Sequence, residues 1–323
     1  MSRFVRDFVF FDRALVELAV LTADLKHWFL LNRSDRRLVG IRSVLGGLAA
    51  MLLIAKTAAA QPNPITSASR LWLEWNVTPN VQWAPRSVDP EAEAERTLHV
   101  FKLQPVFPFR LNEDWTVLTR TIFRFVSVPS AFQDVGLTPV GEPVFLGWDQ
   151  SNRTGLSDVS PTAFFVPNLG SDWTIGFGPS LVIPAGDAPT NSGKLSIGPA
   201  ILGYYHRGPW TIGARMRNIW SVAGDPSRDD VDRFIAQPLI RYQFSKNWYF
   251  TSSPIISSDW SHPDGDGWTV PVGGGLGYAF RLANQPMQIS LEGYYNAVKP
   301  KVDGEELLGD WTIRTQWQVL FPK

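Results

Sequence analysis

The amino-acid sequence predicts an all-β protein, an antiparallel transmembrane β-barrel of about twelve strands preceded by a signal peptide. Three observations lead to this prediction. Apolar and polar residues alternate in segments about ten residues long, short and long connections alternate between the segments, and tryptophans directly follow short connections. Composition agrees, because 26 Gly, 25 Pro and 14 Trp in 323 residues suit strands and turns better than helices.

An export signal precedes the predicted barrel. Three arginines stand before a short apolar run, and alanines follow it (Arg36, Arg37, Arg42; 44–55; 58–60). These are the features of a secretory signal peptide cleaved after Ala60. A transmembrane helix is the alternative, but the apolar run is shorter than the ~20 residues that a spanning helix needs. We therefore assign 1–60 to a leader and signal peptide, with a start codon placed too far upstream, and 61–323 to the outer-membrane barrel.

Period-two alternation recurs along the mature chain. In the last segment, the residues on one face are Trp311, Ile313, Thr315, Trp317, Val319 and Phe321, and those on the other are Thr312, Arg314, Gln316 and Gln318. Alternate side chains of a strand point to opposite faces, as a barrel between lipid and its interior requires. The other predicted strands are 69–77, 97–109, 115–127, 156–167, 173–183, 194–206, 210–221, 231–244, 248–258, 268–280 and 286–297.

The connections between these strands differ in length. Short ones are 110–114, 168–172, 207–209, 245–247 and 282–285, and long ones are 78–96, 128–155, 184–193, 222–230, 259–267 and 298–310. Outer-membrane barrels have short periplasmic turns and longer outer loops. This pattern places both mature termini in the periplasm, which requires an even number of strands.

Tryptophans mark both ends of the predicted barrel. Trp115, Trp173, Trp210 and Trp248 each open a strand after a short turn, and Trp148, Trp220, Trp260, Trp268 and Trp311 lie near long loops. Such placement is typical of the aromatic girdles at membrane interfaces. A soluble sandwich with tryptophans in its core is the disfavoured alternative.

Six prolines lie inside the predicted strands, where each forfeits a hydrogen bond of the ladder. They are Pro105, Pro161, Pro179, Pro199, Pro238 and Pro254. Bulges accommodate some such prolines, so the strand boundaries near them are the least defined.

The sequence offers little for catalysis, cofactors or metals. Cysteine is absent, the formal charge is zero, and hydrolase, metalloprotease and phosphate-loop motifs do not occur. The histidines are scattered (His27, His99, His206, His262), with His99 facing outward by parity. Loop carboxylates could hold a divalent cation, but solvated charges are the simpler interpretation (Asp225, Asp229, Asp230, Asp232, Asp264, Asp266). We predict no enzyme, no cofactor, no metal site and no nucleic-acid partner.

Parity turns a set of charged side chains toward the interior if apolar residues face lipid. These are Lys102, Arg120, Arg124, Arg215, Arg217, Arg241, Arg314, Glu74, Asp158 and Glu292, with Gln104, Gln237, Gln243, Gln288, Gln316 and Gln318. One interpretation is a cationic constriction that favours anionic or polar aromatic solutes. The alternative is a closed interior in which the arginines pair with carboxylates and fill the barrel.

Several short stretches also match a known family. They are QPVFPF at 104–109, LNEDW at 111–115, GLSD at 155–158, GPW at 208–210, NIWSV at 218–222, TSSPI at 251–255, WTVPVGGG at 268–275, YYN at 294–296 and LFPK at 320–323. As a set, they make residues 98–323 resemble the bacterial outer-membrane family associated with the meta-pathway of phenol degradation, often mislabelled neuromedin U. The resemblance implies an outer-membrane barrel with a transport role and no catalytic motif.

Together, these observations predict a channel in the bacterial outer membrane for passive uptake of small polar, anionic or aromatic solutes. Its partners would be outer-membrane lipid and the solute. The alternative function is a non-conducting structural barrel, or one that binds through its loops.

Overall fold

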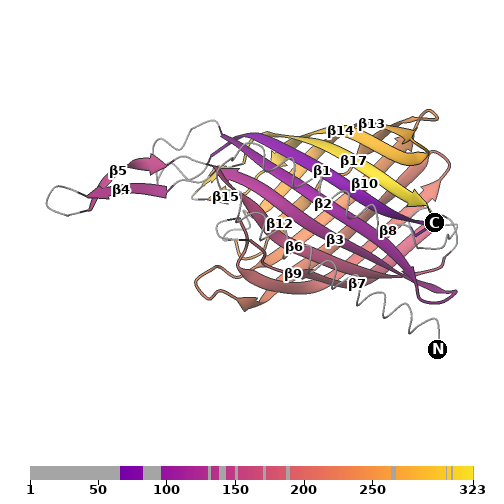
Figure 1. Ribbon diagram of the computed structural model, residues 1–323, viewed down its shortest axis with the longest axis horizontal. Coiled ribbons are helices and arrows are strands. Elements are labelled where there is room, and N and C mark those ends of the chain that lie inside the picture. The colour runs from indigo at the N-terminus through magenta and orange to yellow at the C-terminus, as the bar shows by residue number, and fades with distance from the viewer. Residues whose placement is uncertain are drawn as a thin grey trace. The chain divides into compact units, whose positions relative to one another are not determined.

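A closed antiparallel sheet is the main element of the computed structural model (Figure 1). The structure describes residues 66–82, 96–129, 132–137, 143–149, 152–169, 172–186, 190–262, 267–302, 304–306 and 308–322. The predicted leader, signal peptide and cleavage after Ala60 lie outside these residues. The barrel belongs to the compact unit Ala58–Lys323.

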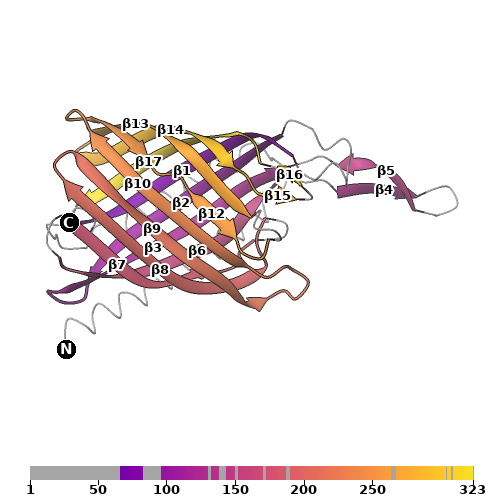
Figure 2. The ribbon, with the colours of Figure 1, turned by 180° about the vertical axis from the view of Figure 1, so that it is seen from behind.

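Twelve strand positions make up the barrel, as the sequence predicts. In chain order they are β1 (Ala68–Val81), β2 (Arg96–Arg110), β3 (Trp115–Pro129), β6 (Asn152–Pro167), β7 (Trp173–Val182), β8 (Lys194–Arg207), β9 (Trp210–Gly224), β10 (Asp232–Gln243), β11 (Trp248–Ser252) with β12 (Ile256–Asp259), β13 (Trp268–Leu282), β14 (Gln285–Val298) and β17 (Trp311–Pro322). Each pairs with its neighbour in sequence, and β17 pairs with β1 to close the barrel. Figure 2 shows β10, β12 and β13 from behind.

Connections at one end of the barrel are short. Between β13 and β14 the turn is Ala283-Asn284, and both residues have positive φ, of 46° and 67°. Two such residues in a row characterise the type I′ turn, whose twist matches that of the flanking strands. Two of the predicted long loops contain short hairpins instead of irregular chain throughout: β4 (Phe132–Leu137) pairs with β5 (Pro143–Asp149), and β15 (Lys301–Val302) pairs with β16 (Glu305–Glu306).

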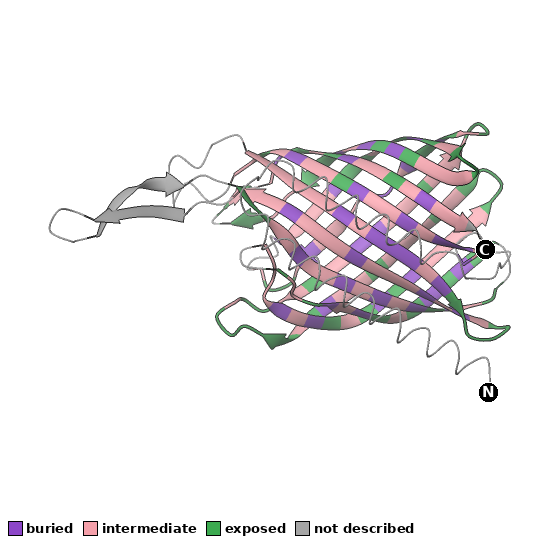
Figure 3. Cartoon of the chain, in the orientation of Figure 1, coloured by how far each residue is buried: buried purple, intermediate pink, exposed green. Residues whose placement is uncertain are grey.

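The exterior of the barrel is apolar. Figure 3 shows exposed and buried residues alternating along the strands, and large apolar side chains such as Phe177, Ile201 and Leu291 are more than half exposed. A soluble protein rarely exposes so wide an apolar surface, whereas a membrane barrel needs one. Among the described residues, no helix is long and apolar enough to cross a membrane.

Aromatic pairs border this exterior at the short-turn end. Trp173 packs on Tyr205, Trp210 on Tyr242 and Trp248 on Tyr278, with ring centroids 4.7, 4.5 and 5.0 Å apart. In each pair the tyrosine lies directly opposite the tryptophan on a neighbouring strand. The predicted girdle is thus built from cross-strand pairs. At the long-loop end, Trp220, Trp260 and Trp311 are also exposed, and the side chain of Trp148 lies outside the described residues.

Gaps in the hydrogen-bonding register explain how the barrel accommodates the prolines. The β2–β3 ladder has no partners at Gln104 and Pro105, and the β8–β9 ladder skips Pro199. Pro179 lies opposite Pro199. Pro254 divides the predicted strand 248–258 into β11 and β12, and β10 has no partner there at Pro238. Because proline has no N–H, the ladder is interrupted where the donors are missing.

Candidate functional site

Two cavities lie inside the barrel, one toward each end. The first, of about 300 Å³, is lined near the short-turn end by Arg70, His206 and Leu320. The second, of about 470 Å³, is lined toward the long loops by Asn76, Arg233 and Thr312. Both cavities are also lined by Arg120, Phe164, Arg215 and Gln237. These four residues therefore form the layer at which the cavities meet.

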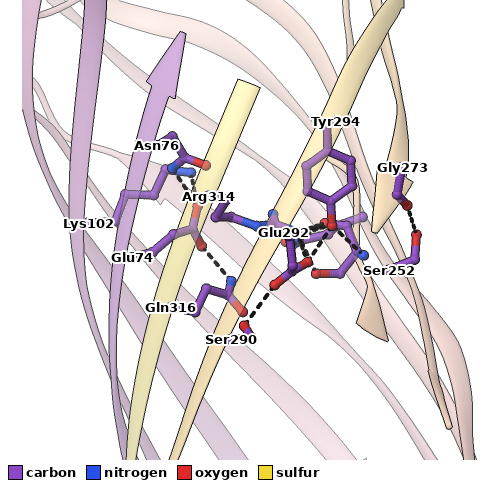
Figure 4. A network of polar contacts seen from close by, with 12 residues as sticks. Glu74, Asn76, Lys102, Ser252, Gly273, Ser290, Glu292, Tyr294, Arg314 and Gln316 are labelled. Carbon is purple, nitrogen blue, oxygen red and sulfur yellow. Dashed lines mark hydrogen bonds and ion pairs between the residues drawn. The ribbon is translucent and has the colours of Figure 1, made fainter. Parts of the chain in front are cut away.

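Glu74 on β1 has a fully occupied carboxylate. Its Oε1 accepts hydrogen bonds from Lys102 Nζ at 2.6 Å and from Asn76 Nδ2 at 2.8 Å. Its Oε2 accepts from the side-chain amide of Gln104 at 3.2 Å and from that of Gln316 at 3.1 Å (Figure 4). The residue is only 2% exposed. A buried carboxylate is tolerated when it is paired and its lone pairs are satisfied.

A second buried carboxylate, Glu292 on β14, pairs with Arg314 on β17. The pair is 2.6 Å long, and the exposed fractions of the side chains are 0% and 2%. Ser290 Oγ donates to Glu292 Oε1 at 2.9 Å, and the hydroxyl of Tyr294 donates to Oε2. We call this group and the one around Glu74 together the carboxylate network; Figure 4 shows both halves.

The break at Pro254 supplies acceptors to this network. Arg314 Nη2 donates to the Ser253 carbonyl at 2.8 Å and to Ser253 Oγ at 2.9 Å. Gln237 Nε2 donates to the same carbonyl at 3.1 Å, and the Ser253 amide donates to the Tyr294 hydroxyl at 2.9 Å. A strand without proline would use these backbone groups in its own ladder. The interruption thus makes them available to the interior side chains.

Three other interior arginines have neutral hydrogen-bond partners, whereas Arg233 pairs with Asp259 at 3.2 Å. An Arg120 Nη donates to Gln104 Oε1, and Arg215 Nε donates to Gln237 Oε1 at 3.0 Å. Arg217 Nη1 donates to the Ser180 hydroxyl at 3.1 Å. We call Arg120, Arg215 and Arg217 the arginine cluster. Its members bind amide or hydroxyl oxygens and so keep an uncompensated charge.

Arg241 depends on a glycine. Its Nη1 donates to Gln288 Oε1 at 2.7 Å, and its guanidinium carbon lies 3.6 Å from the centroid of the Tyr249 ring. A Cβ atom at Gly277 would lie 2.1 Å from that ring. Glycine at 277 therefore allows the ring to lie flat against β13 beneath the cation.

Charge is unequal around the two cavities. Basic side chains that line them are Arg70, Lys102, Arg120, Arg124, Arg215, Arg217, Arg233, Arg241 and Arg314. Among the described lining residues, Glu74 supplies the one carboxylate. Glu292 and Asp259 pair with the lining residues Arg314 and Arg233. The nine basic side chains still outnumber these three carboxylates, and an interior of this composition has a positive potential.

The structure places the sequence-predicted residues in different surroundings. All seven predicted cations and Glu74 line a cavity, and Glu292 is buried beside Arg314. Asp158 lies near the irregularity between Phe123 and Phe125 and accepts hydrogen bonds from the amide and hydroxyl of Ser192, at 3.0 and 3.1 Å. That these residues line a conducting lumen stays a prediction.

Two lining cations, Arg70 and Arg233, are absent from the predicted set. Arg70 has the parity of Glu74, and Arg233 has that of Gln237 and Arg241. The signal was therefore present in the alternation. Both residues lie inside the predicted strands 69–77 and 231–244, so parity applied to them, and they were missing from the predicted set although the alternation indicated them.

The described residues contain no group of three or more His, Cys, Asp or Glu side chains that could hold a metal ion. His99 stacks on the outward Trp75, with ring centroids 5.9 Å apart. Asp225 instead binds the amide and hydroxyl of Ser227, and Asp230 binds Lys194. Asp264 and Asp266 lie outside the described residues.

No family model matches the sequence, and no curated protein matches it. Among solved structures, an outer membrane channel from Pseudomonas putida F1 matches with a TM-score of 0.54 and 13% identity, over 81% of this chain and 97% of that one. The NanC porin matches at 0.45 and 11% identity, over 77% and 98%.

Outer membrane phospholipase A from Escherichia coli matches at a TM-score of 0.39 and 14% identity, over 81% of this chain and 94% of that one. At such identities, likeness to the Pseudomonas channel concerns the fold alone. Together with the apolar exterior, that fold locates the barrel in the bacterial outer membrane. The chain thus shares the fold of the Pseudomonas channel, as a closed antiparallel barrel of twelve strands.

Proposed function

We propose that the protein is an outer-membrane channel through which small polar, anionic or aromatic solutes enter passively, without catalysis. The observation that carries this proposal is the excess of basic side chains around the two interior cavities. A positive, weakly screened interior raises the local concentration of anions and lowers that of cations.

Solute chemistry is the finer part of the proposal. Trp72, Tyr204 and Tyr249 line the first cavity beside arginines, which suits solutes with aromatic rings. The resemblance of residues 98–323 to the family associated with phenol degradation supports the same class. Arg314 and Lys102 pair with carboxylates. The other five members of the predicted cation set, Arg120, Arg124, Arg215, Arg217 and Arg241, would supply the selectivity.

Planar-bilayer recordings of the full-length protein test the channel. Wild type should show anion-selective reversal potentials, more strongly near 0.01 M salt, where the Debye length is about 30 Å, than at 1 M, where it is about 3 Å. The double variant Arg215→Gln and Arg217→Gln should lose most of this preference and still fold. A matched control, Arg110→Gln with Arg281→Gln, removes two exposed arginines at the short-turn end and should change it less.

Cation preference in wild type would contradict the proposal. Absence of conductance would favour the second candidate, a structural or loop-mediated binding barrel. One observation favours that candidate: Gln104, which is 0% exposed, links the buried Glu74 to Arg120. Arg120 lines both cavities, so a side chain held in place there narrows the path through the barrel.

A further inference from the structure

Arg120 and Arg215 border an apolar surface inside the barrel. Arg120 lies directly opposite Val106 on β2, and Arg215 lies directly opposite Leu202 on β8. Both arginines line both cavities. The two charges therefore lie at the junction of the cavities, each at the margin of the same apolar surface.

This apolar surface is a packed cluster that faces inward. Its members are Val106, Leu118, Phe164, Val166, Ala200 and Leu202, with Tyr204 packed against them. Four of these apolar side chains line the first cavity. Opposite them in the same cavity are polar side chains, including Gln288, Gln316 and Gln318. An apolar patch beside a few convergent polar groups is the usual composition of a ligand site.

The two arginines are held in the same way. Gln104 and Gln237 each direct the amide oxygen to an arginine and donate through the amide nitrogen, to Glu74 and to the Ser253 carbonyl respectively. Because each glutamine donates its NH₂ group to these acceptors, the orientation of its amide is fixed and its Oε1 points toward the arginine. A neutral acceptor leaves the guanidinium charge unbalanced, which is costly in a buried site.

Arg120 also has an unused donor. Its Nε is buried and has no hydrogen-bond partner among the described residues. Buried donors of this kind are rare, because each one loses its hydration without replacement. A guanidinium binds a carboxylate through two parallel hydrogen bonds, a geometry that neutral amides do not match.

We propose that Arg120 and Arg215 form a binding site for amphipathic monocarboxylates, which bind the arginines through the carboxylate and rest their apolar or aromatic body on the Val106–Leu118–Phe164–Leu202 surface. This inference rests on the proposed function, since the solute must reach the junction of the cavities. It narrows the solute class to molecules that carry both features at once. A cavity of about 300 Å³ has room for a ring of benzene size.

Isothermal titration of the full-length protein in detergent micelles tests the site with benzoate as the probe. Benzyl alcohol, which keeps the ring without the charge, and acetate, which keeps the charge without the ring, are the comparison ligands. We expect benzoate to bind at least about tenfold more tightly than either, because each of the others loses one class of contact.

Variants then assign the contacts. Arg120→Gln and Arg215→Gln should each weaken benzoate binding by about tenfold or more, whereas Arg281→Gln, an exposed arginine, should leave it unchanged. Phe164→Ala should weaken benzoate and leave acetate unaffected. Retained heat-modifiable mobility on gels would show that each variant is folded.

Two outcomes would overturn the inference: equal binding of benzoate and acetate, or unchanged benzoate binding in folded Arg120→Gln and Arg215→Gln. Binding is measured here without current. If the protein conducts anions but does not bind benzoate, the proposed channel function stands and this binding site is refuted. If it binds benzoate without conducting, the binding site stands and the channel function is refuted.

Discussion

The carboxylate network and the arginine cluster occupy the same interior but use arginine differently. Arg314 contacts a carboxylate, a tyrosine hydroxyl and a backbone carbonyl, and is 2% exposed. Arg215 and Arg217 contact one neutral residue each through the hydrogen bonds described, and are partly exposed to the cavities. The role of an interior arginine therefore depends on its partner: an arginine paired with a carboxylate stabilises the barrel, whereas one paired with a neutral group is available to solutes.

This difference has an energetic basis. A charge removed from water needs an opposite charge and hydrogen bonds to recover its hydration energy. Arg314 recovers its hydration energy through Glu292 and its other protein partners, so removing one member of the pair leaves the other as an unpaired buried charge. The arginine cluster recovers less of its hydration energy within the protein, and an anionic solute would stabilise it. Substitutions should therefore change stability in one region and selectivity in the other.

The largest effect is expected from Arg314→Met, which leaves Glu292 buried without its cation. Loss of one partner of a buried ion pair typically costs about 3–5 kcal/mol. Urea unfolding of the barrel refolded into lipid vesicles should show a decrease of this size in the free energy of unfolding.

The double variant Arg314→Met with Glu292→Met provides the control. Replacing both members of a buried pair by apolar residues is often close to neutral, so the double variant should recover much of the loss. A double variant as unstable as the single one would mean that Arg314 acts through Ser253 and Tyr294 rather than through Glu292.

A smaller effect is expected from Tyr294→Phe. The hydroxyl donates to Glu292 and accepts from the Ser253 amide, so its removal leaves a buried amide unsatisfied. Such a loss typically costs about 1–3 kcal/mol. The same unfolding measurement applies, and an unchanged stability would show that the break at Pro254 does not depend on this tyrosine.

Arg215→Gln should change stability by no more than about 1 kcal/mol, in either direction, because the arginine pairs with a neutral amide near like charges. This variant separates the two regions most directly. If Arg215→Gln destabilised the barrel as much as Arg314→Met, the arginine cluster would be as structural as the carboxylate network, and the two regions would not differ in role.

The smallest effect is expected at the pair Lys194–Asp230, which is 3.0 Å long and whose carboxylate is exposed. Hydrogen bonds from Lys194 and Ser221 lower the pKa of Asp230 below its ordinary value of 3.8. A carboxyl with a lowered folded-state pKa stabilises the protein above its unfolded pKa, and this contribution is lost as the pH falls through the folded value. Wild type should therefore exceed Asp230→Asn slightly in stability at pH 6, and the two should converge as the pH falls through the lowered folded-state pKa of Asp230. A difference that persisted at low pH would exclude this ion pair as its cause.

Much of the fold follows from local sequence. Alternation such as that of Trp311 to Phe321, together with tryptophans after short turns, was enough to predict twelve strands and their order. These signals are local because the outward residues of a barrel strand contact lipid directly and are therefore apolar. The hairpins within 128–155 and 298–310 were missed, since nothing in their alternation separates them from irregular loops.

Parity also indicated which charged side chains face inward, since it depends only on the two-residue period of a strand. It could not indicate their partners. Glu74 meets Gln316, 242 positions away, only because β17 pairs with β1. Likewise, the Pro254 break became a source of acceptors for Arg314 only once β13 and β14 were paired in order between β11 and β17. Sequence determined the strands and the faces of their side chains; closure and register decided which charges are satisfied within the protein and which remain for a solute.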